Sequence, residues 1–222
     1  LLLRVTENCP WNKCKFCMLY KKKDFHTRPV AEVKKDIDTM ANYRDMILAH
    51  KDGENWNMPA VQKEYAELPS DEARMCYQMV FTWLTEGDSQ AIFLQDANTM
   101  VLRTEWLLEI VSYVRERLPE IKRITSYGRA NTLAKISEED YRALRQAGLD
   151  RIHSGYESGS DKVLKLICKG TTQEEQIIGG RKVRDAGIEL SIYFMPGVGG
   201  RELSDDNATV SYTHLTLPTI LR

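Results

Sequence analysis

Apolar residues along this chain fall into short runs that alternate with longer segments of helical periodicity. Short apolar runs bounded by turn residues are typical of buried strands, and apolar positions at i, i+3, i+4 and i+7 are typical of helices packed on one side. The runs predict strands at 1–6, 91–95, 123–127, 151–155 and 188–194. Later strands begin about 30 residues apart, the length of one strand–helix unit. We therefore expect an α/β fold with about five parallel strands and right-handed helical connections.

The segments between the runs predict helices with recognisable ends. Apolar spacing favours a helix over 30–49. Thr104 is expected to cap a helix that Pro119 ends, and Ser137 one that ends at Gly148. A short helix should follow Ser160. Thr172 with Glu175 has the pattern of a capping box, and that helix should end at Gly187.

Residues from about 51 to 88 are expected to form a helical insert between the first two strands. Its first part, 51–69, has no clear periodicity and is expected to be irregular. Ser70 is expected to cap the helix that follows, in which Met75, Met79, Val80 and Trp83 share one face.

Composition places the chain among ordinary globular proteins. It has 222 residues, 42% of them hydrophobic and 28% charged, with a net charge of −1. There is no basic footprint of a nucleic-acid-binding domain, no apolar run as long as a membrane span and no secretory leader pattern. Five cysteines, an odd number with three of them clustered, are a poor disulfide framework, so we expect a reducing, cytoplasmic setting.

The two ends of the chain have an unusual composition. The first residue, Leu1, already lies inside an apolar run. Residues 210–219 read VSYTHLTLPT, which resembles the translation of a transposon adapter used in sequencing libraries. We therefore expect one domain over 1–209 followed by a non-native tail over 210–222, and a chain that is a fragment.

The stretch CPWNKCKFC brings Cys9, Cys14 and Cys17 together on a loop that follows the first strand. In a parallel sheet such loops lie at the edge where ligands bind. A structural zinc site needs four ligands, and the nearest fourth candidate is His26. A four-iron cluster would have one iron without a protein ligand, as in a catalytic site with an open position. Cys76 and Cys168 lie in or beside helical patterns, which favours a packing role.

The cysteine loop resembles that of the radical S-adenosylmethionine (SAM) superfamily, in which the usual spacing is C-x3-C-x-aromatic-C. Phe16 matches the aromatic residue, whereas the first interval has four residues instead of three. The stretch GYESGSDKVL at 155–164 resembles the family's fourth-strand signature. The resemblance implies a partial (β/α)6 TIM-barrel-like core. It points most closely to the branch that contains oxygen-independent coproporphyrinogen oxidases and related proteins without an assigned function.

The resemblance also implies cofactors and a reaction. Cys9, Cys14 and Cys17 would hold three irons of a [4Fe–4S] cluster, and the amino and carboxylate groups of SAM would chelate the fourth iron. One electron from the cluster would cleave SAM, and the resulting 5′-deoxyadenosyl radical would abstract hydrogen from a substrate that the sequence does not name. Positions that match the family's SAM-binding segments are Phe16, Gln95, Asp96, Asn98, Ser126, Arg129, Glu157 and Gly197.

These positions have expected roles, each with an ordinary structural alternative. Phe16 should pack over the cluster. Asp96 and Asn98 could accept hydrogen bonds from the SAM ammonium group, or cap their loop. Glu157 is expected to bind ribose hydroxyls or the ammonium group, the alternative being a carboxylate stabilised by the dipole at a helix N-terminus. Arg129 could pair with the SAM carboxylate, although a surface salt bridge is the commoner use of such a residue.

Lysines surround the cysteine loop although the whole chain is nearly neutral. They are Lys13, Lys15, Lys21, Lys22 and Lys23. Their positive field would suit the docking of an acidic electron donor such as a flavodoxin. The alternative is an ordinary lysine-rich loop exposed to solvent. Two other functions stay open at this point: a Cys3His zinc module for interactions, and a relative that binds the cluster or SAM without catalysis.

Overall fold

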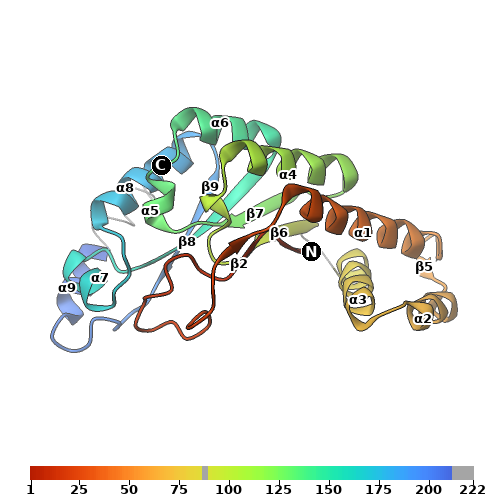
Figure 1. Cartoon of the computed structure of the whole chain (residues 1–222), viewed down its shortest axis with the longest axis horizontal. Helices are drawn as coiled ribbons and strands as arrows, with labels where there is room; N and C mark the ends of the chain where they lie inside the picture. Colours follow the sequence, from red (N-terminus) through yellow and green to blue (C-terminus); the bar gives the residue numbers. More distant parts are fainter. Residues whose placement is uncertain (87–89, 212–222) are drawn as a thin grey trace.

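The structure, a computed structural model, describes residues 1–86 and 90–211 (Figure 1). Its largest sheet has five strands, and every neighbouring pair in it is parallel. In spatial order these strands are β1 (Leu2–Arg4), β6 (Ala91–Gln95), β7 (Arg123–Tyr127), β8 (Leu149–Glu157) and β9 (Glu189–Phe194). Spatial order follows chain order, as successive right-handed βα units require.

Helices fill the connections between the strands. Between β1 and β6 lie α1 (Val30–Leu48), α2 (Met58–Glu67) and α3 (Asp71–Glu86). The 3₁₀ turn η1 (Thr99–Val101) and α4 (Thr104–Arg117) lead to β7, and α5 (Ala130–Leu133) and α6 (Glu138–Ala147) lead to β8. Then α7 (Asp161–Leu166) and α8 (Gln173–Asp185) lead to β9, and α9 (Ser204–Ser211) follows it.

The core lies between one face of the sheet and the helices. Alternate strand residues point to that face, so Ile92, Leu94, Ile124 and Ile152 are completely buried. The apolar periodicity after Thr104 predicts five buried residues in and just after α4, and all five are buried. They are Leu107, Ile110, Val111, Val114 and Leu118. The fold is therefore the predicted α/β architecture, a parallel sheet that corresponds to part of a TIM-barrel-like core.

The two ends of the sheet have different surroundings. Figure 1 shows the loop over residues 8–25, α7 and α9 at one end of the molecule, and α2 and α3 at the other. The loop over 8–25 is held at its base by two short antiparallel strands, β2 (Thr6–Glu7) and β3 (His26–Thr27). It lies at the carboxyl ends of the parallel strands, where α/β folds bind their ligands.

The prediction of an irregular segment over 51–69 is wrong. A hairpin of β4 (Lys51–Asp52) and β5 (Asn55–Trp56) is followed there by α2. Gly53, with φ of 60°, permits the tight turn between the two strands. The Asn57 side chain accepts a hydrogen bond from the Ala60 backbone, and Pro59 lies in the first helical turn. This cap-and-proline signal marked a helix that the apolar spacing alone did not reveal.

Helix ends agree with the sequence in most places. The Ser137 side chain caps α6, Gly148 ends it in the left-handed conformation, and Thr172 with Glu175 makes a complete capping box. Thr104 is not a cap, because it is the first residue of α4 and the capping position belongs to Arg103, whose side chain makes no capping bond.

Two other details of the structure differ from what the sequence pattern indicates. Met75 is 73% exposed, and Tyr77 occupies the buried face of α3 instead. Strand β8 extends beyond the predicted 151–155 in both directions.

The predicted domain end at residue 209 falls inside α9, and residues 212–222 of the predicted tail lie outside the described residues. Among the described residues, no helix combines the length and the apolar character needed to cross a membrane.

Candidate functional site

The cysteine loop, residues 8–25, is tied to distant parts of the chain. Asp96, at the end of β6, accepts hydrogen bonds from the Asn8 backbone (3.1 Å) and the Tyr20 hydroxyl (2.5 Å). The Trp11 indole donates to the carbonyl of Cys168 (2.7 Å), and the Lys15 backbone donates to that of Ile167 (2.9 Å). These bonds fix the loop over the carboxyl ends of the strands.

A glycine makes the approach of Trp11 possible. Gly170 has φ of 68°, and a Cβ atom at this position would overlap the Trp11 ring. Only a residue without a side chain permits both the left-handed backbone and the close contact. The segment after α7 is therefore shaped to receive the cysteine loop.

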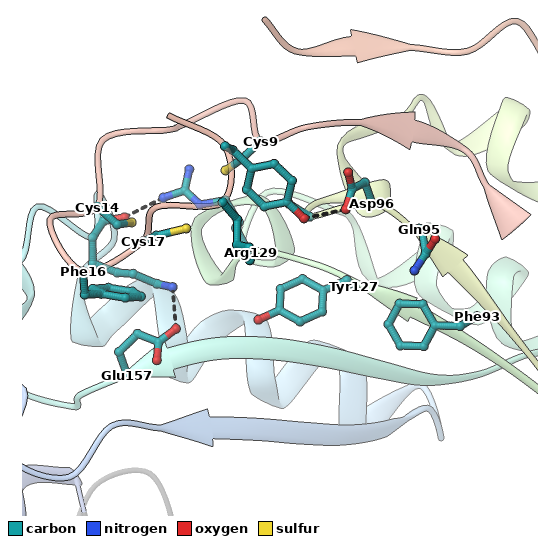
Figure 2. A pocket seen from close by; sticks show the side chains of 14 residues that line it. Cys9, Cys14, Phe16, Cys17, Phe93, Gln95, Asp96, Tyr127, Arg129 and Glu157 are labelled. Carbon is teal, nitrogen blue, oxygen red and sulfur yellow. Dashed lines mark hydrogen bonds and ion pairs between the residues drawn. The ribbon is translucent and has the colours of Figure 1, made fainter. Parts of the chain in front are cut away.

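The loop closes one side of a cavity of about 340 Å³. Cys9, Cys14 and Cys17 all line it, and none of them forms a disulfide. Figure 2 shows the three cysteines and Phe16 at one side of the cavity, and Phe93 and Gln95 at the other. The cavity size is at the lower end of the range for small-molecule sites.

His26 is not brought to the three cysteines. It is exposed on β3, where it pairs with Glu7, and it does not line the cavity. Within residues 1–86 and 90–211, no three His, Cys, Asp or Glu side chains are arranged to hold one metal ion. A single zinc ion needs all its ligands around one atom, whereas a four-iron cluster distributes its thiolates over separate irons. The arrangement gives no support to a Cys3His zinc site.

Two buried cations face the thiols. Arg129 is 7% and Lys169 is 7% exposed, and both line the cavity. Burial raises the pKa of the Cys14 thiol, and the positive charges of Lys169 and Arg129 act against this shift. A loop of thiols beside fixed positive charge is suited to holding thiolates once a metal centre compensates for their desolvation.

Arg129 has no carboxylate partner among the described residues. Its guanidinium donates to the Lys169 carbonyl (2.6 Å) and lies 5.0 Å from the centre of the Trp11 ring. The expected surface salt bridge is therefore wrong. The reason is that Arg129, the residue just before α5, is covered by Trp11 of the cysteine loop.

Glu157 and Lys169 form a buried ion pair with a distance of 2.9 Å (Figure 2). Glu157 has φ of 65°, in the left-handed region that residues with a side chain seldom adopt. The register between β8 and β9 shifts at this point, and the bulge turns the carboxylate toward Lys169. Sequence reasoning missed Lys169, which lies 12 residues after Glu157, beyond a helix.

The cavity contains five of the eight residues predicted to contact SAM. They are Phe16, Gln95, Asp96, Arg129 and Glu157. Asp96 is already engaged by Asn8 and Tyr20, so it anchors the cysteine loop whatever else it binds.

The other three predicted contacts lie outside this cavity. Ser126 is fully buried on the helix-covered face of β7, and its neighbour Tyr127 faces the cavity instead. Asn98 is 1% exposed and uses its side chain to bond the Arg129 backbone (2.9 Å) and Thr132 (2.9 Å). Gly197 lies in the loop after β9, with φ of 77°. Strand alternation, which places Ser126 and Tyr127 on opposite faces, was the available signal for Tyr127.

The family model described as "Radical SAM superfamily" matches residues 85–210, which is more than half of the chain. The matched range covers β6 to α9 and does not include the cysteine loop.

Two curated relatives are similar to parts of the chain. The 4′-phospho-dehydrooxetanocin synthase of Priestia megaterium is 27% identical over 197 residues, which is 88% of this chain and 23% of the relative. The tRNA uridine(34) acetyltransferase of Methanocaldococcus infernus is 29% identical over 70 residues, 32% of this chain and 13% of the relative. The chain therefore spans less than a quarter of the length of each of these two relatives.

Solved structures show the same fold. The cobalamin-dependent S-adenosylmethionine radical enzyme OxsB with aqua-cobalamin bound aligns with a TM-score of 0.57 and 21% identity, over 96% of this chain and 26% of that one. The same enzyme with aqua-cobalamin and S-adenosylmethionine aligns with a TM-score of 0.56. The family match, with the parallel sheet and the cavity at its carboxyl edge, identifies the chain as a member of the radical SAM superfamily.

Proposed function

We propose that this chain is the cofactor-binding part of a radical SAM enzyme, in which Cys9, Cys14 and Cys17 hold three irons of a [4Fe–4S] cluster. The proposal depends on one observation above all: three free cysteines of one loop line a single cavity at the carboxyl edge of the sheet. When bound, the cluster and SAM supply a 5′-deoxyadenosyl radical that abstracts hydrogen from the substrate. The residues present fit these groups, because thiol donors and buried cations line the same space.

The charged side chains of the cavity have separate roles in this proposal. Arg129 is the candidate partner for the SAM carboxylate, since no carboxylate of the described residues pairs with it. Lys169 is already paired with Glu157, and the pair orients both side chains in a buried place. Glu157 has a second carboxylate oxygen to offer a ribose hydroxyl or the ammonium group.

Aromatic side chains are proposed to keep water out of the site. Phe16, Phe93, Tyr20 and Tyr127 line the cavity, and the Phe16 ring also lies 5.6 Å from the Lys169 ammonium group. Burial raises the pKa of Tyr127, with Glu157 adding to the shift, so its hydroxyl stays protonated at neutral pH. Aromatic side chains that exclude water protect a reactive carbon radical from solvent.

Several finer points remain proposals. They are the coproporphyrinogen oxidase-like branch, the cytoplasmic setting and the flavodoxin-like electron donor, all of which come from the sequence. This chain aligns with 26% of the OxsB chain. The activity of a whole enzyme of that kind would therefore need more protein than this chain contains. A relative that binds the cluster or SAM without catalysis would release no 5′-deoxyadenosine.

The test is anaerobic purification followed by measurement of iron, sulfide and 5′-deoxyadenosine. The wild-type chain should be brown, contain about four irons per chain and release 5′-deoxyadenosine from SAM when a strong reductant is added. Cys14→Ala should lose both properties. Cys76→Ala is the matched control, because Cys76 lies on α3 at the other end of the molecule, and it should keep both.

Three results would contradict the proposal in different ways. A colourless protein with one zinc ion would support the interaction module instead. Iron without any 5′-deoxyadenosine would support the non-catalytic relative. Release of 5′-deoxyadenosine by Cys14→Ala would remove the cluster assignment itself.

A further inference from the structure

The face of the sheet that the helices leave free has an unusual composition. One row of paired residues across four strands consists of Phe93, Thr125, Arg151 and Glu189. The next row includes Tyr127, His153 and Ser191, and beyond it Gly155 pairs with Tyr193. Parallel barrels whose interior is a packed core fill such rows with Val, Ile and Leu. On β6 to β9 these rows contain none of these three residue types, and the one Leu, Leu2 on β1, pairs with Phe93 at the edge of the sheet, so this face is suited to a bound molecule.

Four side chains on this face form a continuous surface of rings, which we call the aromatic wall: Phe93, Tyr127, His153 and Tyr193. The centres of the Phe93 and His153 rings are 5.6 Å apart. The Tyr193 ring is stacked on His153 at 5.4 Å with an angle of 10° between the planes, and on Tyr127 at 6.2 Å with an angle of 13°. Tyr193 is nevertheless 47% exposed, so the stack leaves ring surface available to a ligand.

The aromatic wall continues into the cysteine cavity. Phe93 and Tyr127 line that cavity together with Cys9, Cys14 and Cys17 (Figure 2). A molecule that stacks on the wall therefore lies next to the place where the cofactors are proposed to bind.

The wall is uncharged and has hydrogen-bonding groups. The Tyr193 hydroxyl bonds to His153 Nδ1 at 2.8 Å. Burial lowers the pKa of His153, and Arg151 adds to the shift, so its ring is neutral at pH 7. Stacking on such rings stabilises flat heterocycles, and the hydroxyl, the imidazole and nearby Ser191 can bond polar atoms at a heterocycle's edge.

We propose that the aromatic wall binds the substrate, and that the substrate carries a flat, uncharged heteroaromatic ring. The inference rests on the proposed function, because the wall is a substrate site only if radical chemistry takes place in the adjoining cavity. A saturated substrate would gain no stacking from the rings, and a strongly charged one would lose hydration against them.

The test uses 2-aminopurine, a flat heterocycle whose fluorescence falls when it stacks on other rings. It is titrated into the anaerobically reconstituted 222-residue chain in saturating SAM without reductant, so that the adenine site is already filled. Tyr193→Leu removes the ring, and Tyr193→Phe keeps the ring while removing the hydroxyl. The matched control is Trp106→Leu, since Trp106 is 39% exposed on α4, outside the wall.

We expect the wild-type chain to quench the probe and Tyr193→Leu to bind it about tenfold more weakly, as loss of one stacking partner predicts. Tyr193→Phe should lose less, and Trp106→Leu should bind like the wild type. Absence of quenching in the wild type, or equal binding by Tyr193→Leu, would each overturn the proposal.

Iron content and 5′-deoxyadenosine release on the same preparation separate the two proposals. A preparation that cleaves SAM but does not bind 2-aminopurine overturns the aromatic wall and leaves the proposed function intact. A preparation that binds the probe but contains no cluster overturns the proposed function, and the wall's role as a substrate site is then lost with it.

Discussion

At the scale of single residues, the ion pair of Glu157 and Lys169 is the most sensitive feature of the site. The two side chains are 10% and 9% exposed. Lys169→Met should lower the free energy of unfolding by about 3 kcal/mol, because it leaves an uncompensated buried carboxylate. The double variant Glu157→Gln/Lys169→Met should recover most of this loss, since it removes both charges. Urea unfolding of the wild type, the single variants and the double variant measures the coupling.

A double variant as unstable as Lys169→Met alone would mean that the lysine acts through packing against Phe16 and not through its charge.

Single residues also show what the sequence could not provide. The cysteines, Glu157 and Arg129 were identified from local motifs. Lys169, Trp11 and Tyr20 were not, because their partners are separated from them by 12, 157 and 76 positions in the chain. No local pattern encodes such contacts.

At the scale of elements, helix ends were predicted well where a side chain does the capping. Thr172, which caps its helix, and Thr104, which does not, allow this difference to be tested. Thr172 accepts a hydrogen bond from the Glu175 backbone at 3.2 Å, whereas Thr104 is already inside its helix. Thr172→Ala should therefore lower the free energy of unfolding by about 1 kcal/mol, and Thr104→Ala by much less. Equal losses in chemical denaturation of the two variants would contradict this assignment of the caps.

The elements also explain which parts of the fold could be predicted. Strands β6, β7 and β9 and helices α1, α4, α6 and α8 have strong apolar periods, and the sequence located them nearly to the residue. The hairpin β4–β5 and helix α2 have few buried residues, with Val61 the one residue of α2 that is buried, so periodicity gave no signal for them. Capping chemistry at Asn57 and Pro59 was the better indicator there.

At the scale of the whole molecule, charge is nearly balanced but unevenly placed. The net charge is −1, whereas the cysteine loop exposes Lys13, Lys15, Lys22 and Lys23. A local positive field beside the proposed cluster would accelerate encounter with an acidic electron donor, and dissolved salt would screen it. We expect reduction of the reconstituted chain by a flavodoxin to slow markedly as salt is raised from about 10 to 500 mM.

Two triple variants with the same net charge test whether the position of the lysines matters. Lys13→Gln/Lys15→Gln/Lys23→Gln should lower the second-order rate constant at low salt by about tenfold and flatten its salt dependence. The control is Lys35→Gln/Lys63→Gln/Lys122→Gln, three exposed lysines outside the cysteine loop, which should leave the rate nearly unchanged. Stopped-flow absorbance of the flavodoxin follows the reaction. If both variants slow it equally, overall charge governs the encounter, and the cysteine loop is not the docking surface.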